Sequence, residues 1–246
     1  MDKMLYTATN GARQAMQAQT TISHNLSNAN TVGFKSHFNT FTSWNVAGPG
    51  LNTRVMSQQQ ADDIDLSSGA IVTTDRELDV AINGDGFITV ENAEGVQAFT
   101  RAGDLRLDSV GRLTTGQGFA VVGNGGPIAL PPAEKIEIGL DGSISLRPVG
   151  QSADAMVIAD KIKLVNPNLN ELYKTPDGLL QVRSGLIEPP SPDVQLESGV
   201  IEKSNVNSVG QMIELITNAR QFETNIKLMQ EAKSNDEASA RLLRNS

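Results

Sequence analysis

The side chains that first suggest chemistry are the carboxylates and two histidines, and the chain contains no cysteine. His24 lies in a helical pattern and His37 in an aromatic-rich stretch. His24 is beside the apolar turn from Ile22 to Leu26, which favours a packed or interface histidine over a metal ligand. The sequence contains no P-loop, GxSxG nucleophile motif or HExxH zinc helix. These residues therefore predict no paired-histidine metal site.

Acidic residues gather in two runs, at positions 62–65 and 75–79. Such runs could bind calcium, but they lack the glycine and the terminal glutamate of an EF-hand loop. A solvated charged surface is the favoured interpretation. Two carboxylates on a β scaffold could also hydrolyse a glycoside, although nothing in the sequence singles out a pair. We therefore expect no enzymatic activity, no cofactor and no metal.

Two Gly-X-Gly segments, at positions 84–86 and 116–118, are similar to phosphate-binding loops. Neither segment opens a helix, and their surroundings are acidic, whereas phosphate sites use the positive end of a helix. We interpret both segments as hairpin turns.

Charge is distributed unevenly along the chain. Residues 1–47 and 200–246 together carry +2, so the formal net charge of −8 arises from a middle segment of about −10. The field of this segment repels nucleic-acid phosphates and anionic lipid, which argues against both as partners. No apolar run reaches the roughly 18 residues of a membrane-spanning helix, so we expect no membrane span. The first residues lack the pattern of a cleaved secretory signal.

Proline and glycine divide the chain into three parts. All 10 prolines lie between Pro49 and Pro192, as do most of the 22 glycines. Because these residues break helices and build turns, we predict an α+β fold with long N- and C-terminal helices and an antiparallel β-rich middle. The expected domains are an N-terminal helix with its following segment at 1–47, a β-rich domain at 48–199 and a C-terminal helix at 200–246.

Apolar residues in the two end segments recur at spacings of three and four, which is typical of a coiled-coil seam. Between Arg13 and Lys35 there is no charged residue, so the outer face of the first helix is expected to pack as well. A helix packed on the core of its own domain remains the alternative. We expect the helices to form a coiled-coil-like pair that is mobile in a monomer and ordered in an assembly. The seams comprise Leu5, Ala8, Ala12, Ala15, Gln19, Ile22, Leu26 and Ala29, and Val209, Met212, Ile216, Ala219, Phe222, Ile226 and Met229.

The middle segment shows alternation with a period of two. Residues 78–90 (LDVAINGDGFITV) predict a hairpin with its turn at 83–86. Further turns are predicted at 94–95, 110–111, 141–142 and 177–178. The aromatic residues Phe34, Phe38, Phe41 and Trp44 have helical spacing, which we interpret as packing rather than as a ligand-stacking surface.

Four segments resemble flagellar rod and hook proteins. Residues 22–35 (ISHNLSNANTVGFK) are similar to the N-terminal signature of that family, and residues 196–207 (LESGVIEKSNVN) to its second shared segment. Residues 78–87 and 99–104 are similar to the middle domain of the longer rod proteins. The opening MDKMLY, RAGDL at 101–105 and ELYKT at 171–175 resemble the proximal-rod member more than the distal one, which remains an alternative.

The resemblance implies a structural subunit of a helical axial shaft that transmits torque and surrounds an export channel. It also implies passage through the flagellar export apparatus without a cleaved signal, a periplasmic location, and other proximal-rod subunits and the distal-rod protein as partners. A peptidoglycan-binding module and a hydrolase are the rival classes. The candidate assembly residues are Leu5, Ala8, Ala12, Ala15, Ile22, Asn25, Leu26, Asn28, Thr31, Gly33, Phe34, Asn205, Asn207, Met212, Ile216 and Phe222.

Overall fold

The structure is a computed structural model that describes residues 3–45, 55–150 and 156–244. Its contacts divide the chain into two compact units. The helical unit consists of Met1–Ala29, Ser36–Asp65 and Val206–Ser246, and the β unit of Asn30–Lys35 and Leu66–Asn205. The predicted α+β class, with a helix towards each end of the chain and an antiparallel β-rich middle, is confirmed. The boundary expected between residues 47 and 48 lies outside the described residues.

The elements follow one another along the chain in the order predicted from proline and glycine, with helices outside and strands between. They are α1 (Lys3–Ser27), β1 (His37–Asn45), β2 (Val55–Ile64), β3 (Ile71–Thr73), β4 (Val80–Asn83), β5 (Phe87–Glu91), β6 (Gln97–Thr100), β7 (Arg106–Leu107), β8 (Leu113–Thr114), β9 (Ala120–Gly123), β10 (Gly126–Pro127), β11 (Ala133–Ile138), β12 (Ser143–Pro148), β13 (Val157–Lys161), β14 (Leu164–Val165), the 3-10 helix η1 (Leu169–Glu171), β15 (Leu172–Lys174), β16 (Leu180–Val182), β17 (Gln195–Ser198), β18 (Val200–Glu202) and α2 (Ser208–Arg244).

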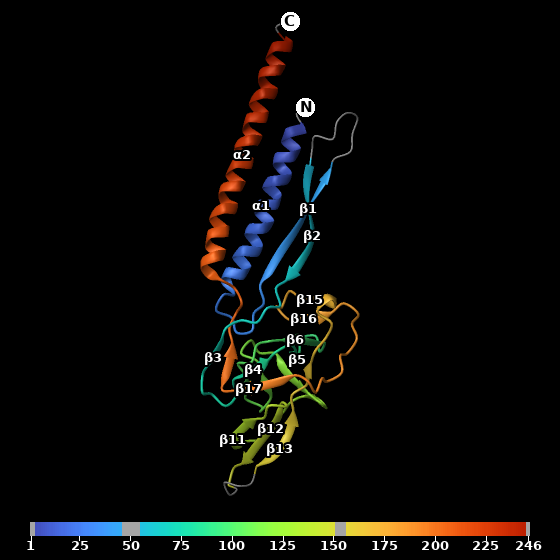
Figure 1. Ribbon diagram of the computed structural model, residues 1–246, viewed down its shortest axis with the longest axis vertical. Coiled ribbons are helices and arrows are strands. Elements are labelled where there is room, and N and C mark those ends of the chain that lie inside the picture. The colour runs from blue at the N-terminus through green and yellow to red at the C-terminus, as the bar shows by residue number, and fades with distance from the viewer. Residues whose placement is uncertain (1–2, 46–54, 151–155, 245–246) are drawn as a thin grey trace. The chain divides into compact units, whose positions relative to one another are not determined.

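Within the helical unit, α1 and α2 lie side by side and run in opposite directions (Figure 1). Near one end of the pair, the Asn25 Nδ2 amide donates a hydrogen bond to Gln211 Oε1 at 3.4 Å. Towards the other end, the Thr9 hydroxyl donates to Met229 Sδ at 3.3 Å. Within the described ranges, neither helix combines the length and apolar character needed to cross a membrane.

Small side chains line the contact between the two helices. Ala8, Ala12 and Ala15 are all buried, at 5–6% exposure. A Cβ atom on Gly11 would lie only 2.9 Å from the side-chain oxygen of the buried Asn225. Alanine and glycine therefore allow the two backbones to approach closely, and their spacing in the sequence is the spacing of one helical face.

The aromatic stretch after α1 is a β-strand, so its helical spacing was a wrong guide to local structure. Residues His37–Asn45 form β1, which pairs antiparallel with β2 in the helical unit, with an irregularity in register between Thr40 and Phe41. The strand HFNTFTSWN contains aromatic and threonine residues and no strong helix former. Such composition favours a pleated strand, and this preference outweighs the accidental spacing of the aromatic residues.

The β unit contains one large sheet and three smaller ones. In the large sheet the strand order is β15-β16-β6-β5-β9-β8-β7, with β10 paired to β9 and β14 paired to β5. The smaller sheets are β11-β12-β13, β17-β4 and β18-β3. Every strand pair is antiparallel. These statements concern the described strands.

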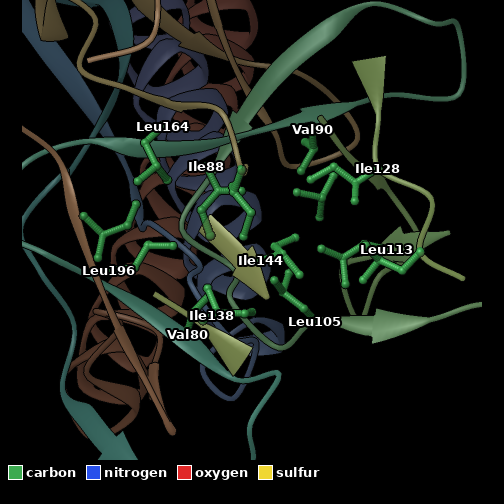
Figure 2. Close-up of a cluster of buried hydrophobic side chains, with 14 of the residues drawn as sticks. Val80, Ile88, Val90, Leu105, Leu113, Ile128, Ile138, Ile144, Leu164 and Leu196 are labelled. Carbon is green, nitrogen blue, oxygen red and sulfur yellow. The ribbon is translucent and has the colours of Figure 1, made fainter. Parts of the chain in front are cut away.

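Branched aliphatic side chains form the core of the β unit (Figure 2). Ile88, Leu105, Leu113 and Ile144 each have no exposed surface. Figure 2 shows these side chains gathered in one cluster, although Ile88 and Ile144 lie far apart in the sequence. Burying a side chain of this size stabilises a fold by about 1.5–3 kcal/mol, so this cluster is the main source of stability of the β unit.

The predicted turns at 94–95, 110–111, 141–142 and 177–178 are confirmed, because each connects two strands that pair with each other. The turn at 116–118 likewise connects β8 and β9.

The predicted hairpin at 78–90 is wrong. β4 pairs with β17, whereas β5 pairs with β6, β9 and β14. Gly84 and Gly86 have φ values of +85° and +134°, and a Cβ on Gly86 would lie 2.6 Å from Val194. The turn therefore directs the chain into another sheet. Both strands are buried on both faces, so the alternation in sequence did not mark one solvent face.

Candidate assembly surface and buried charged cluster

The helical unit leaves an apolar stripe of α2 in contact with solvent. Val209, Met212, Ile213 and Ile216 are 65%, 51%, 61% and 55% exposed. Their spacing of three and four places them on one side of the helix. A contiguous exposed apolar surface of this kind commonly marks a protein-protein contact. We call these four residues the α2 stripe.

The predicted assembly residues fall into two groups in the helices. Ala8, Ala12, Ala15 and Ile22 are buried inside the helical unit, and Leu26 and Phe222 are half-buried. Leu5, Met212 and Ile216 are exposed, at 41%, 51% and 55%. The structure therefore brings the small seam residues together within one chain and leaves the larger apolar residues on its surface.

Asn25 links α1 to strand β1. Its Nδ2 amide donates to the His37 carbonyl at 2.7 Å, and its Oδ1 accepts from the His37 N–H at 2.9 Å. The side-chain amide thus binds the strand backbone as another strand would, and satisfies both backbone groups of His37. The rings of His24 and His37 lie edge to face with centroids 5.4 Å apart.

Asn28 and Asn207 bind backbone at the ends of the two helices. Asn28 Nδ2 donates to the His24 carbonyl of α1 at 2.9 Å. Asn207 Oδ1 accepts from Gly210 N–H at 3.1 Å, the contact of a helix N-cap. Such contacts satisfy backbone groups that a helix end leaves without an intrahelical partner.

The signature residues Thr31, Gly33 and Phe34 lie in the β unit. Gly33 has a φ of +66°, and a Cβ there would lie 2.2 Å from the backbone of Arg101 and Ala102. Only glycine fits this position without displacing backbone. Phe34 is buried, and its carbonyl accepts from Asn205 N–H at 3.3 Å. The carbonyl of Thr31, which is half-buried, accepts from Phe34 N–H at 3.4 Å.

A buried charged cluster lies between the two signature segments in the β unit. Lys35 Nζ is 2.7 Å from Glu202 Oε1, and Arg101 Nη1 is 3.1 Å from Glu202 Oε2. The three side chains are only 2–4% exposed. Glu202 Oε1 also accepts from Gly69 N–H at 2.8 Å. Buried charges are tolerated when paired and hydrogen-bonded in this way.

The cluster controls the ionisation of Glu202. Burial raises its pKa, but hydrogen bonds from Lys35 and Gly69 and the charges of Lys35 and Arg101 outweigh burial. The pKa of Glu202 is therefore held below its ordinary value, and the group is a carboxylate at neutral pH.

Lys174, in strand β15, contacts the end of the N-terminal signature segment at 22–35. Its Nζ donates to the Lys35 carbonyl at 2.8 Å and lies 3.6 Å from the centre of the Phe34 ring, a cation-π contact. Burial lowers the pKa of Lys174 to about 8.

Sequence reasoning missed Lys35, Arg101 and Glu202 as a group. A signal was present, because each lies inside a segment that resembles the rod family and two of them flank apolar residues. Charged residues inside such segments suggest ion pairs between the segments. Their positions in the sequence do not indicate which of them pair.

The acidic runs hold no arrangement of metal ligands in the part of the chain that is described, where no three His, Asp or Glu side chains converge. Asp79, in the second run, accepts from Thr74 Oγ1 at 2.8 Å and pairs with Arg76 at 2.9 Å. These contacts use the carboxylate in a turn. An exposed apolar helix surface in one unit and a closed core in the other are typical of a subunit of a larger assembly.

Comparison with known proteins specifies the assembly. Three family models match in chain order: "Flagella basal body rod protein" at 5–35, "Flagellar hook protein FlgE/F/G D1 domain" at 81–146 and "Flagellar basal body rod FlgEFG protein C-terminal" at 197–242. The flagellar basal-body rod protein FlgF of Salmonella typhimurium is 34% identical over 99% of both chains. FlgF of Escherichia coli is 35% identical over 96% of both, and the rod protein FlgG of Bacillus subtilis 32% identical over 93% of this chain and 94% of its own.

The chain belongs to the flagellar basal-body rod protein family and is FlgF-like. It is a structural rod subunit of the flagellar basal body and not an enzyme, as the sequence predicted. Family membership implies assembly with other rod components.

Proposed function

We propose that the protein is a proximal-rod subunit whose two terminal helices form a coiled-coil-like pair inside a helical axial shaft. The α2 stripe carries this proposal, because Met212 and Ile216 present apolar surface that the described chain does not cover. Many repeated helix contacts give a shaft the stiffness needed to transmit torque, and head-to-tail contacts that do not close into a ring produce a helical tube.

We further propose that the assembly residues act in two ways. One group holds the two helices of one subunit together, so that the helices form one surface. This group consists of Ala8, Ala12, Ala15, Ile22, Leu26 and Phe222. Leu5, Met212 and Ile216 contact neighbouring subunits. The polar and signature residues determine where the helices begin and end, which sets the direction of that surface. These residues are Asn25, Asn28, Thr31, Gly33, Phe34, Asn205 and Asn207.

The proposed partners are other proximal-rod subunits, the distal-rod protein and the flagellar export apparatus. The proposed location is the periplasmic rod, reached through that apparatus without a cleaved signal. The similarity to two FlgF proteins supports the proximal position, which the sequence resemblance implied. Because the chain is also similar to FlgG of Bacillus subtilis, the distal rod is the second candidate position. Expression of the chain in a strain that lacks FlgF and in a strain that lacks FlgG distinguishes the two positions, because only the strain that lacks the equivalent protein should regain motility.

The experiment is a double substitution of the α2 stripe, Met212→Ser with Ile216→Ser. Both side chains are already exposed, so monomer stability should change by no more than about 0.5 kcal/mol per site. Rod completion, counted as cells that carry hooks, should fall at least ten-fold. The matched control is Val110→Ser with Leu140→Ser, which removes two exposed apolar side chains, at 73% and 68% exposure, from the β unit. Equal hook counts in the two double variants would contradict the proposal.

A further inference from the structure

The chain passes between the helical unit and the β unit four times. The passages follow Ala29, Lys35, Asp65 and Asn205. Any force that acts on the helices must reach the β unit at least partly through these four covalent connections. The residues beside the passages therefore decide whether force is spread over the β unit or concentrated on single strands.

Hydrogen bonds within the β unit join the residues beside these passages. Gly33 N–H donates to the Glu202 carbonyl at 2.8 Å, and Lys35 Nζ donates to the Ser67 carbonyl at 2.7 Å. Asn205 Nδ2 donates to the same Ser67 carbonyl at 3.2 Å. Three segments that are far apart in the sequence, near residues 34, 67 and 204, are thus bonded into one block.

The charged cluster connects this block to the core of the β unit. Glu202 accepts from Lys35 and Gly69 through one oxygen and from Arg101 through the other. Arg101 also donates to the Gly84 carbonyl at 2.8 Å, and its guanidinium lies 5.3 Å from the centre of the fully buried Phe87 ring. Lys35, Arg101 and Glu202 each come from a different one of the three family matches.

We propose that the Lys35–Glu202–Arg101 cluster is a torque-transmitting joint, with Glu202 as its central positioning residue. The proposal rests on the function as a rod subunit. Removing one partner of a buried ion pair is costly, while a well-packed apolar replacement of the whole pair is often as stable. Net stability alone therefore does not account for buried charges here. Directional bonds to fixed oxygens resist twisting, whereas apolar side chains can slide past one another.

The decisive variant is Glu202→Gln, which keeps the shape and removes the charge. Cells in which this variant replaces the original chain should still assemble flagella, and their rotation speed in viscous medium should fall at least two-fold relative to the original chain. Their speed in dilute medium should change less. The matched control is Lys135→Met, which breaks the exposed Lys135–Glu137 pair of the same unit and should leave both speeds unchanged.

The load dependence separates a joint from a fold stabiliser. If Glu202→Gln reduces only the number of flagella, and those that form carry viscous load normally, the cluster merely stabilises the fold and the proposal is overturned. Lys35→Arg keeps the positive charge and should keep most of the speed under load, whereas Lys35→Met should match Glu202→Gln. Cells with both Glu202→Gln and Lys35→Met should rotate their flagella under load no more slowly than the slower of the two single variants, because the charges act as a unit.

A measurement on the unaltered chain tests the joint even if Glu202→Gln does not fold. The amides of Gly33, Gly69 and Asn205 are held by the cluster or by the bonded segments beside it. Their hydrogen exchange should proceed through one common opening and agree within about three-fold in protection. Independent exchange, with protection factors more than ten-fold apart, would overturn the proposal. If the chain fails to enter the rod at all, the proposed function fails, while this exchange result still stands.

Discussion

The two units differ in what their clustered apolar side chains contact. In the β unit, Ile88, Leu105 and Leu113 have no exposed surface. In the helical unit, Val209 and Ile213 are more than 60% exposed although they lie in a regular helix. The β unit thus completes its core within one chain, and the helical unit retains apolar surface that another molecule can cover.

This difference indicates how one chain can have one unit that is stable by itself and another that is completed by neighbouring molecules. A closed core stabilises a unit by itself, whereas most helical stability comes from tertiary packing of an apolar face. The small seam of Ala8, Ala12 and Ala15 buries little area per residue, because alanine has a single methyl group. We therefore expect the free subunit to combine a stable β unit with a marginal helical unit.

The largest expected effect concerns the β core. Ile144→Ala should lower the free energy of unfolding by about 2–5 kcal/mol, because it removes buried methyl groups and leaves a cavity. Thermal unfolding followed by circular dichroism measures this loss. Ile158→Ala is the control, since Ile158 is 71% exposed and should cost no more than about 0.5 kcal/mol. Similar losses in both variants would mean that the β core is not closed.

A smaller effect is expected in the helical seam. Ala12→Leu should cost about 1–3 kcal/mol, because extra methylene groups do not fit where the two helices approach closely. Helical ellipticity should disappear at a lower temperature, while the β signal should unfold as before. Met16→Leu, at an exposed site of the same helix, should have no such effect. An unchanged helical transition in Ala12→Leu would show that α1 and α2 are not packed in the free subunit.

The charged cluster predicts an acid-dependent contribution from Glu202. Its pKa is below the 4.5 of an unperturbed glutamate, so unfolding takes up a proton when the pH falls below about 4.5. The stabilisation is present above that pH and is lost as the pH falls, by at most about 1.4 kcal/mol per pH unit. Urea unfolding between pH 6 and pH 3 should therefore bring the original chain and Glu202→Gln closer together. Parallel curves would contradict this assignment.

The smallest expected effect comes from Lys174. Its pKa is about 8 when folded and 10.5 when unperturbed, so unfolding takes up a proton between these two pH values. Stability should then rise with pH in this window relative to Lys174→Met, by less than about 1 kcal/mol per pH unit. Urea unfolding at pH 7.5, 8.5 and 9.5 measures the trend. If the stability of the original chain relative to Lys174→Met instead falls with pH, the cation-π contact with Phe34, which is lost on deprotonation, outweighs the cost of burying the charged amine.

Much of the fold could be predicted from local signals. Proline and glycine placement located both helices, and Asp-Gly and similar turns located five hairpins, because these features depend on backbone preferences of a few adjacent residues. The partner of β4 could not be predicted, since β17 lies more than 100 residues away in the sequence. Strand pairing over such distances depends on the whole core rather than on any one segment.

The candidate site was predictable to different degrees. The burial of Ala8, Ala12 and Ala15 was predictable from their spacing, whereas their role in assembly, like that of Gly33, stays a prediction. The role of Lys35 was not foreseen, because a lone lysine in a segment poor in charge gives no sign of a carboxylate 167 positions later. Electrostatic partners become visible only when the fold brings them together.

The contact between Ser67 and Asn205 has an evolutionary consequence. The long segment between these residues starts and finishes at nearly the same point, since Asn205 Nδ2 lies 3.2 Å from the Ser67 carbonyl. A domain whose two ends are adjacent can be enlarged, shortened or exchanged without moving the chain on either side of it. Insertions or deletions within this segment are therefore expected to leave the chain before and after it in place.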